Sequence, residues 1–115
     1  MSIKITKDFI RELPKPELHC HLDGSLRLET ILDLAEKDNV ELPSRNPDIL
    51  RKAVTVTSNN ITLPEYIKKF DLTLSILQTP ESLTRAAFEL AEDCRKENVL
   101  YLEVRYSPIL TQSAE

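Results

Sequence analysis

The sequence contains a single glycine, Gly24, among 115 residues. It also has no apolar run approaching the roughly 20 residues that cross a bilayer. So little glycine excludes collagen-like and low-complexity chains. The first ten residues include Lys4, Lys7 and Asp8 and lack the apolar core of a secretory signal peptide. These absences predict a soluble protein that neither enters a membrane nor follows the secretory route.

Cysteine is scarce as well, because Cys20 and Cys94 are the only two and they form no C-x-x-C pair. Two cysteines are too few for a disulfide scaffold, so we predict a reduced, cytoplasmic protein. Positive charge is not in excess, since 15 Lys and Arg face 19 Asp and Glu, with a net charge of -4 and a pI near 5.2. Such a chain is expected to bind neither nucleic acid nor a membrane surface, because both need a basic patch.

What is present is an ordinary globular composition, 41% hydrophobic and 30% charged, on a length of one domain at most. Residues 17–23 alternate with the period of a strand, and Gly24, free to take a positive φ, is expected to end it. Helices are predicted from residue 28 to about 38 and over 63–77. A short helix is predicted over 47–53, within an otherwise irregular stretch, 43–60. A last helix is predicted to start at Thr79, with an apolar face of Leu83, Ala87, Leu90, Ala91 and Cys94. Residues 99–106 are rich in β-forming residues and start as a nearly continuous apolar run, typical of a parallel strand covered on both faces. Strands separated by helices predict an α/β fold.

The two histidines of the chain, His19 and His21, lie on the first predicted strand, followed by Asp23. Side chains two residues apart point to the same side of a strand, about 6.5 Å apart at a rise of roughly 3.3 Å per residue. Two imidazoles at that spacing can converge on one metal ion. A bare H-x-H also occurs by chance, and a strand histidine is often only a core or surface residue. Cys20 is expected on the opposite side, towards covering helices.

Glu103 and Arg105 share one face of the second predicted strand. In a buried strand both charges need partners. They either support a site inside the fold or simply pair with each other. The acidic and basic side chains along the predicted helices are expected to form solvated faces.

The segment from Pro14 to Ser25, which reads PKPELHCHLDGS, resembles the first motif of the adenosine deaminase family of metal-dependent amidohydrolases. Three further segments look like the family's next motifs, in order and at similar spacing: Glu29–Leu32, Leu63-Pro64 with Phe70-Asp71, and Tyr101–Pro108. The resemblance covers nearly all of residues 14–108. It implies the N-terminal part of a TIM (β/α)8 barrel, roughly its first two strands with helical insertions.

The resemblance assigns roles to particular residues. His19 and His21 would be two ligands of one catalytic Zn2+, and His21 would also face the substrate. Asp23 would hydrogen-bond the ribose, and Gly24 would let its backbone approach the purine. An apolar lid over the substrate would consist of Leu63, Tyr66, Ile67 and Phe70. In the similar adenine deaminases the acid after the histidines is usually glutamate, so Asp23 favours a nucleoside over a free base.

The function implied is hydrolytic deamination of adenosine, and of deoxyadenosine, to inosine and ammonia. An adenine or modified-nucleoside deaminase of the same superfamily is the close alternative, and a noncatalytic truncated chain is the alternative of another class. The family's remaining metal ligands and its acid and base groups come later in the barrel, which takes about 250 residues. We therefore expect residues 1–115 to be a single incomplete domain with no catalytic residue of its own. Alone it should be inactive, and its partners would be a purine nucleoside and the complementary part of the barrel.

Overall fold

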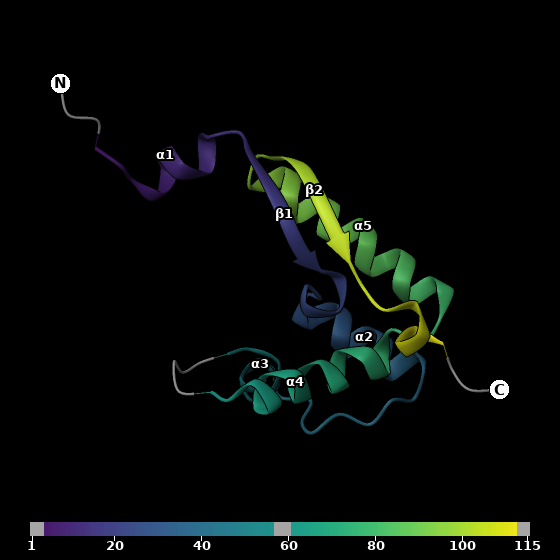
Figure 1. Cartoon of the computed structure of the whole chain (residues 1–115). Coiled ribbons are helices and arrows are strands. Elements are labelled where there is room, and N and C mark those ends of the chain that lie inside the picture. The colour runs from purple at the N-terminus through teal and green to yellow at the C-terminus, as the bar shows by residue number, and fades with distance from the viewer. Residues whose placement is uncertain (1–3, 57–60, 113–115) are drawn as a thin grey trace.

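The computed structural model describes residues 4–56 and 61–112. In chain order the elements are α1 (Lys7–Glu12), β1 (Lys15–His21), the 3-10 turn η1 (Leu22–Gly24), α2 (Leu28–Lys37), α3 (Pro47–Val54), α4 (Leu63–Ile76), α5 (Pro80–Lys96), β2 (Val99–Arg105) and the 3-10 turn η2 (Pro108–Thr111). Figure 1 shows β1 and β2 side by side along α5, with α2, α3 and α4 grouped beyond one end of the strands. No helix of the described part is long and apolar enough to cross a membrane.

The two strands pair in parallel, with Lys15 opposite Val99 and His21 opposite Arg105. Parallel neighbours need a long crossover, which the helices between residues 22 and 98 supply. The predicted α/β fold, with strand, helices and strand in that order, is confirmed. The predicted short helix over 47–53 is also confirmed as α3, whereas residues 57–60 of the expected irregular stretch lie outside the described residues.

The end of β1 differs from the prediction. The strand stops at His21, because residues 22–24 turn into η1, so Asp23 lies on the turn rather than on the strand. Gly24 is free to take a positive φ but does not do so here, since it lies in a helical turn, which needs a negative one. Positive φ occurs instead at Asn39 (54°) and Asn98 (57°), just after the ends of α2 and α5, where asparagine is the usual substitute for glycine.

Local signals account for most helix starts. Thr79 caps α5 as predicted, accepting a hydrogen bond from the backbone N–H of Ser82, with Pro80 at the first helical position. Thr62 and Glu65 form a capping box at α4. Helix α1 was not predicted, because its six residues bury no side chain and so leave no apolar stripe in the sequence.

Two apolar clusters hold the elements together. The first joins α2, α3 and α4 and consists of Ile31, Leu34, Ala35, Leu50 and Ile76. The second joins η1 and α5 and consists of Leu22, Leu77, Ala86 and Leu90, with Cys20, Cys94 and Leu102 packed against it. Cys20 therefore points away from the histidines, as predicted. On α5, Leu83, Leu90 and Cys94 face the core as predicted. The prediction was wrong for Ala87 and Ala91, which are exposed, and Ala86 is buried instead.

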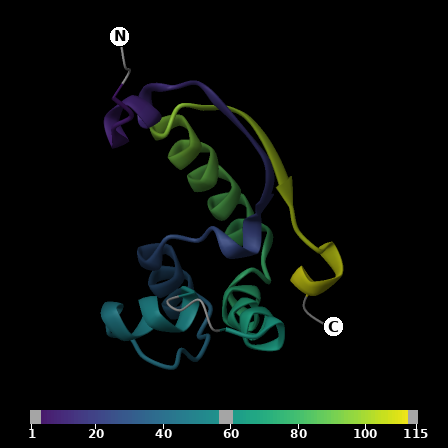
Figure 2. The same ribbon diagram turned by 60° about the vertical axis from the view of Figure 1, so that its left-hand side comes forward.

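One side of the strand layer is open. The expectation that the second strand is covered on both faces was wrong, since Leu100 is 75% and Val104 43% exposed. The radius of gyration is 16.1 Å, compared with about 13 Å for a compact domain of roughly this length. Figure 2 shows the two strands curving above the group formed by helices α2, α3 and α4. Helices α2, α3 and α4 and the η1 turn are therefore the well-packed part of the molecule. The candidate functional side chains lie where the two strands meet these elements.

Candidate active site

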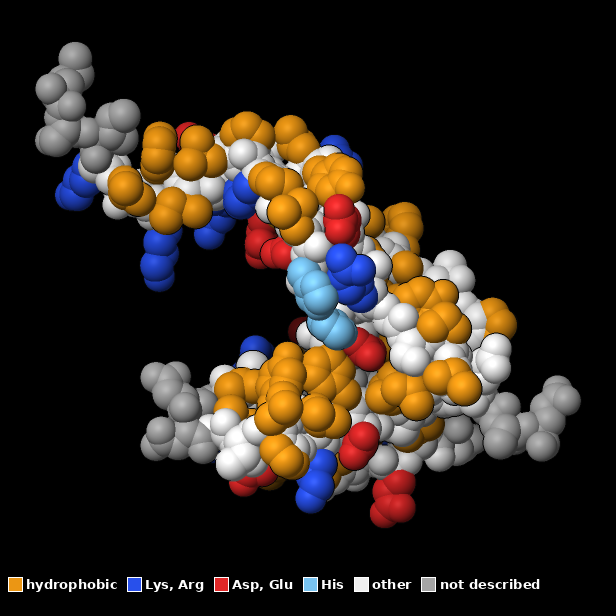
Figure 3. Space-filling model, viewed as in Figure 1, with side chains coloured by type: hydrophobic (Ala, Val, Ile, Leu, Met, Phe, Trp, Pro, Cys, Tyr) orange, Lys and Arg blue, Asp and Glu red, His pale blue; other side chains and the backbone are white. Residues whose placement is uncertain are grey.

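The two histidines of β1 form the centre of the site. Their rings project to the same side, as predicted, with Nε2 of His19 3.1 Å from Nε2 of His21 and ring centroids 5.1 Å apart. The pleat of the strand causes this pairing, because alternate side chains share a face. Figure 3 shows both rings exposed at the edge of the hollow between the strands and the helical group.

Residues of β2 complete one side of the histidine pair. Nε of Arg105 donates a hydrogen bond to Nδ1 of His19 at 3.0 Å, and Nη2 of Arg105 lies 3.3 Å from Oε2 of Glu103. The hydroxyl of Tyr101 donates to Oε1 of Glu103 at 2.9 Å. The alternative in which Glu103 and Arg105 pair with each other is therefore confirmed. Arg105 also contacts His19, so the alternative of a role at the site stays a prediction.

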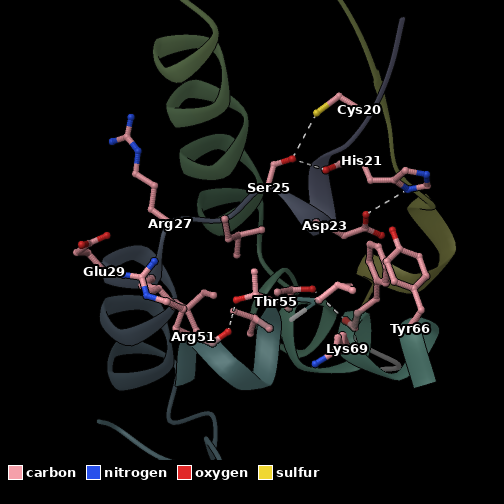
Figure 4. Close-up of a pocket in the computed structure, with 18 of the residues that line it drawn as sticks. Cys20, His21, Asp23, Ser25, Arg27, Glu29, Arg51, Thr55, Tyr66 and Lys69 are labelled. Atoms are coloured by element: carbon pink, nitrogen blue, oxygen red, sulfur yellow. Dashed lines mark hydrogen bonds and ion pairs between the residues drawn. The ribbon is translucent and has the colours of Figure 1, made fainter. Parts of the chain in front are cut away.

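The η1 turn places Asp23 below His21. Asp23 is 7% exposed, and within residues 4–56 and 61–112 its buried Oδ1 has no hydrogen-bond partner. Nδ1 of His21 lies 3.6 Å from this oxygen, which is beyond a normal hydrogen bond (Figure 4). Ser25 closes the turn, because its hydroxyl donates to the carbonyl of His21 at 2.6 Å. A buried carboxylate without a donor is costly, so this oxygen is placed to receive a hydroxyl or N–H group of a ligand.

Helix α4 supplies an aromatic wall next to the turn. The Phe70 ring meets His21 edge-on at 5.8 Å, and Tyr66 meets Phe70 in the same manner at 5.3 Å. A Cβ on Gly24 would lie 3.2 Å from Cε1 of Phe70, closer than ordinary carbon contacts. The close approach of Phe70, and not the φ angle of Gly24, is therefore what disfavours a larger residue at this position.

An open cavity of ≈ 700 Å³ runs from these residues towards α3. Its lining includes His19, His21, Asp23, Gly24, Tyr66 and Phe70. Six of the eight predicted site residues are thus brought together around one cavity. Leu63 and Ile67 are 69% and 54% exposed on α4 and do not line it, so their place in an apolar lid stays a prediction.

The histidine pair fits a metal ion in spacing. Two nitrogens 3.1 Å apart can both lie about 2.0–2.1 Å from one zinc ion, which binds imidazole readily. The described residues contain no group of three or more His, Cys, Asp or Glu that could hold a metal. If His19 and His21 bind zinc, they supply two of the about four ligands that the ion needs.

Ion pairs connect α5 with α2 and with Arg27, the residue just before α2. Arg27 donates to both carboxylate oxygens of Asp93, at 3.0 and 2.7 Å, and this contact lowers the pKa of Asp93. Burial raises the pKa of Glu89, but hydrogen bonds from Arg85 and Thr30 outweigh it, so the net direction is down. The expectation that charges on these helices are only solvated was wrong here. Only the i, i+4 spacing of Arg85, Glu89 and Asp93 hinted at the pairing.

The chain was compared with known proteins. A family model described as adenosine deaminase matches residues 14–115. An adenosine deaminase of Clostridium botulinum (strain Hall) is 52% identical over 100 residues, which are 87% of this chain and 30% of that protein. An adenosine deaminase of Vibrio vulnificus (strain YJ016) is 48% identical over 101 residues, 88% of this chain and 30% of that protein. The chain thus spans about 30% of the length of these relatives.

Solved structures agree with these sequence matches. The structure of the ADAL–IMP complex is 34% identical, with a TM-score of 0.65 over 92% of this chain and 32% of that chain. The apo N6-methyl-AMP deaminase from Arabidopsis thaliana is 31% identical, with a TM-score of 0.61 over 92% of this chain and 31% of that chain. The prediction that the fold is part of a (β/α)8 deaminase barrel is confirmed. Because the family model covers nearly the whole chain and the relatives share about half of their aligned residues with it, the chain belongs to the adenosine deaminase family.

Proposed function

We propose that the protein containing this chain is a zinc-dependent enzyme that hydrolyses adenosine, and deoxyadenosine, to inosine and ammonia. The observation that carries the proposal is the pair of facing imidazoles at a cavity whose floor holds a buried carboxylate oxygen without a partner. A zinc ion, when bound, supplies activated water at neutral pH. The residues 1–115 contribute part of the site, as one incomplete domain that works with the complementary part of the barrel.

The chain's own residues bind and orient the nucleoside. Oδ1 of Asp23 accepts a hydrogen bond from a ribose hydroxyl, which satisfies an otherwise unpaired buried acceptor. Gly24 presents only backbone to the purine, so the base can approach the turn closely. Tyr66 and Phe70 form the apolar wall against which the base packs. Leu63 and Ile67, on the same helix, extend this wall as a lid over bound substrate.

His19 and His21 hold the ion through the two nitrogens that face each other. Neutral imidazoles suit this task because they leave the charge of the ion nearly undiminished. The free thiols Cys20 and Cys94 support a cytoplasmic, reducing location as part of the same proposal.

A second candidate is a deaminase of purine nucleotides. It is favoured by the similar structures, which include complexes with IMP and GMP and an N6-methyl-AMP deaminase. Asp23 argues against it, since a buried carboxylate at the sugar end repels a phosphate group. A free base such as adenine would leave the carboxylate without its hydroxyl donor.

The test is a substrate panel on the complete protein with zinc. It contains adenosine, deoxyadenosine, adenine, AMP and N6-methyl-AMP, with product formation followed by chromatography. Adenosine and deoxyadenosine should be turned over fastest. Faster turnover of AMP or N6-methyl-AMP would make the nucleotide enzyme correct, and no turnover of any member would refute the deaminase assignment.

Zinc content identifies the ligands. His19→Ala and His21→Ala should each lose zinc and activity. Cys20→Ala is the matched control, because Cys20 lies between the two histidines in sequence but packs into the core on the other side of the strand. It should keep its zinc. Normal zinc content in both histidine variants would remove these two residues from the metal site.

A further inference from the structure

The η1 turn is closed by Ser25, the residue that follows it. The Ser25 hydroxyl donates to the backbone carbonyl of His21 at 2.6 Å, and the Ser25 N–H donates to the carbonyl of Leu22 at 3.1 Å. On the core side, Sγ of Cys20 lies 3.4 Å from the Ser25 hydroxyl oxygen. Figure 4 shows the Ser25 side chain reaching back to His21. Ser25 thus ties the end of β1 to the far end of the turn.

Asp23 lies between two residues whose places are fixed by packing. Leu22 is buried in the apolar cluster that joins η1 and α5, and Gly24 lies against the ring of Phe70. Packing of these neighbours does not by itself determine where the carboxylate of Asp23 points, because the peptide units on both sides of Asp23 can still rotate. The hydrogen bonds of Ser25 restrict this rotation, since they connect the segment before Asp23 with the segment after it.

The carboxylate of Asp23 has a physical reason to leave its place. Its Oδ1 is buried and has no hydrogen-bond partner within residues 4–56 and 61–112. Burial of such an oxygen costs free energy, which the side chain would recover by swinging into the open cavity and becoming hydrated. A closed turn opposes this movement. The buried orientation of Asp23 therefore depends on the contacts that close η1.

We propose that Ser25 is a positioning residue, which closes the η1 turn and thereby holds the carboxylate of Asp23 where it accepts a hydrogen bond from the sugar of a nucleoside. This inference rests on the proposed function in one respect, namely that Asp23 binds the ribose. Its consequence is specific for the sugar. Loss of the Ser25 hydroxyl weakens the binding of ligands that carry ribose and leaves the binding of the free base unchanged. A hydroxyl that only stabilises the fold would affect both kinds of ligand alike, or neither.

The test compares two ligands by NMR titration of the complete, zinc-loaded protein. Inosine carries the ribose, and hypoxanthine is the same base without it. In Ser25→Ala the dissociation constant of inosine should rise about two- to tenfold, the range of one net hydrogen bond, and that of hypoxanthine should stay unchanged. In steady-state kinetics KM for adenosine should rise by a similar factor at unchanged kcat, because the sugar contact is present in the ground state and in the transition state.

Two further variants serve as controls. Ser75→Ala removes the same kind of bond, since the Ser75 hydroxyl donates to the carbonyl of Leu72 at 2.6 Å, but Ser75 is exposed on α4 and does not line the cavity. It should leave both dissociation constants unchanged. Asp23→Ala shows whether Ser25 acts through Asp23. In that background Ser25→Ala should not weaken inosine any further, because the carboxylate that Ser25 positions is gone.

The inference is overturned if Ser25→Ala leaves inosine binding unchanged, weakens inosine and hypoxanthine equally, or keeps its full effect in the Asp23→Ala background. If Asp23→Ala alone does not weaken inosine, the ribose contact of the proposed function fails together with this inference. If Asp23→Ala does weaken inosine, a negative Ser25 result overturns this inference only. Should Ser25→Ala not fold, Ser25→Thr and Ser25→Val give the same comparison, because they have nearly the same shape and differ in the hydroxyl.

Discussion

Substitution of Gly24 by alanine tests how the η1 turn and helix α4 shape the cavity. Gly24 does not have a positive φ, so the backbone accepts a side chain without strain. The added Cβ would lie 3.2 Å from Cε1 and 3.5 Å from Cζ of Phe70, so the ring must move by a few tenths of an ångström. Phe70 borders open space and can turn. We therefore expect a loss of stability of at most about 2.6 kcal/mol, since overpacking costs about 1–3 kcal/mol and the stiffer unfolded chain returns about 0.4–1 kcal/mol.

Gly24→Ala should also lower activity. A turned Phe70 changes the apolar wall and its edge contact with His21. If this removes about 1–2 kcal/mol of binding to the reacting substrate, kcat/KM for adenosine falls roughly five- to thirtyfold. Steady-state kinetics measures this, and urea unfolding measures the stability.

The control for Gly24→Ala is the same substitution in a Phe70→Leu background. Leucine lacks the ring atoms that meet the new Cβ, so Gly24→Ala should cost clearly less there, with a coupling of about 1 kcal/mol between the two sites. Equal costs in both backgrounds would refute the reasoning, because the glycine would then be required for something other than Phe70.

Three further predictions concern stability, each followed by urea unfolding. Arg27→Met should destabilise the protein, since it leaves Asp93 without its bidentate partner. The loss should exceed that of Arg11→Met, which removes one partner of a more exposed ion pair; equal losses would refute a special role of Arg27. The pKa of Asp93 is lowered in the folded state, so its contribution is present above the ordinary aspartate pKa of about 3.9 and is lost as pH falls through the folded value. In Asp93→Asn this part of the acid sensitivity should disappear, and an unchanged pH profile would contradict the assignment. Leu50→Ala, at a fully buried position between α3 and its neighbours, should cost about 2–5 kcal/mol, and a loss well below this range would mean that the site collapses around the smaller side chain.

Some contacts of the site belong to segments that are far apart in the sequence. Arg105 reaches His19 across 86 positions, and Arg27 reaches Asp93 across 66. The periodicity of a single segment cannot reveal such contacts, because these contacts depend on the register of β1 against β2 and on how α2 packs on α5. The Arg105–His19 and Arg27–Asp93 contacts were therefore missed for one reason, namely that they depend on tertiary packing. The errors at Ala87 and Ala91 have the same cause, because the packing of α5 decides which of its residues are buried.

The amino-acid sequence alone determined what neighbouring residues impose on each other. Alternation along a strand puts the rings of His19 and His21 on one side, and Thr79 with Pro80 starts a helix wherever the chain lies. Only the tertiary structure decided that Asp23 is buried without a partner, and that Gly24 is small because Phe70 comes close. Both properties arise when α4 packs against the η1 turn. Burial and close approach depend on two segments together, so neither segment's sequence determines them by itself.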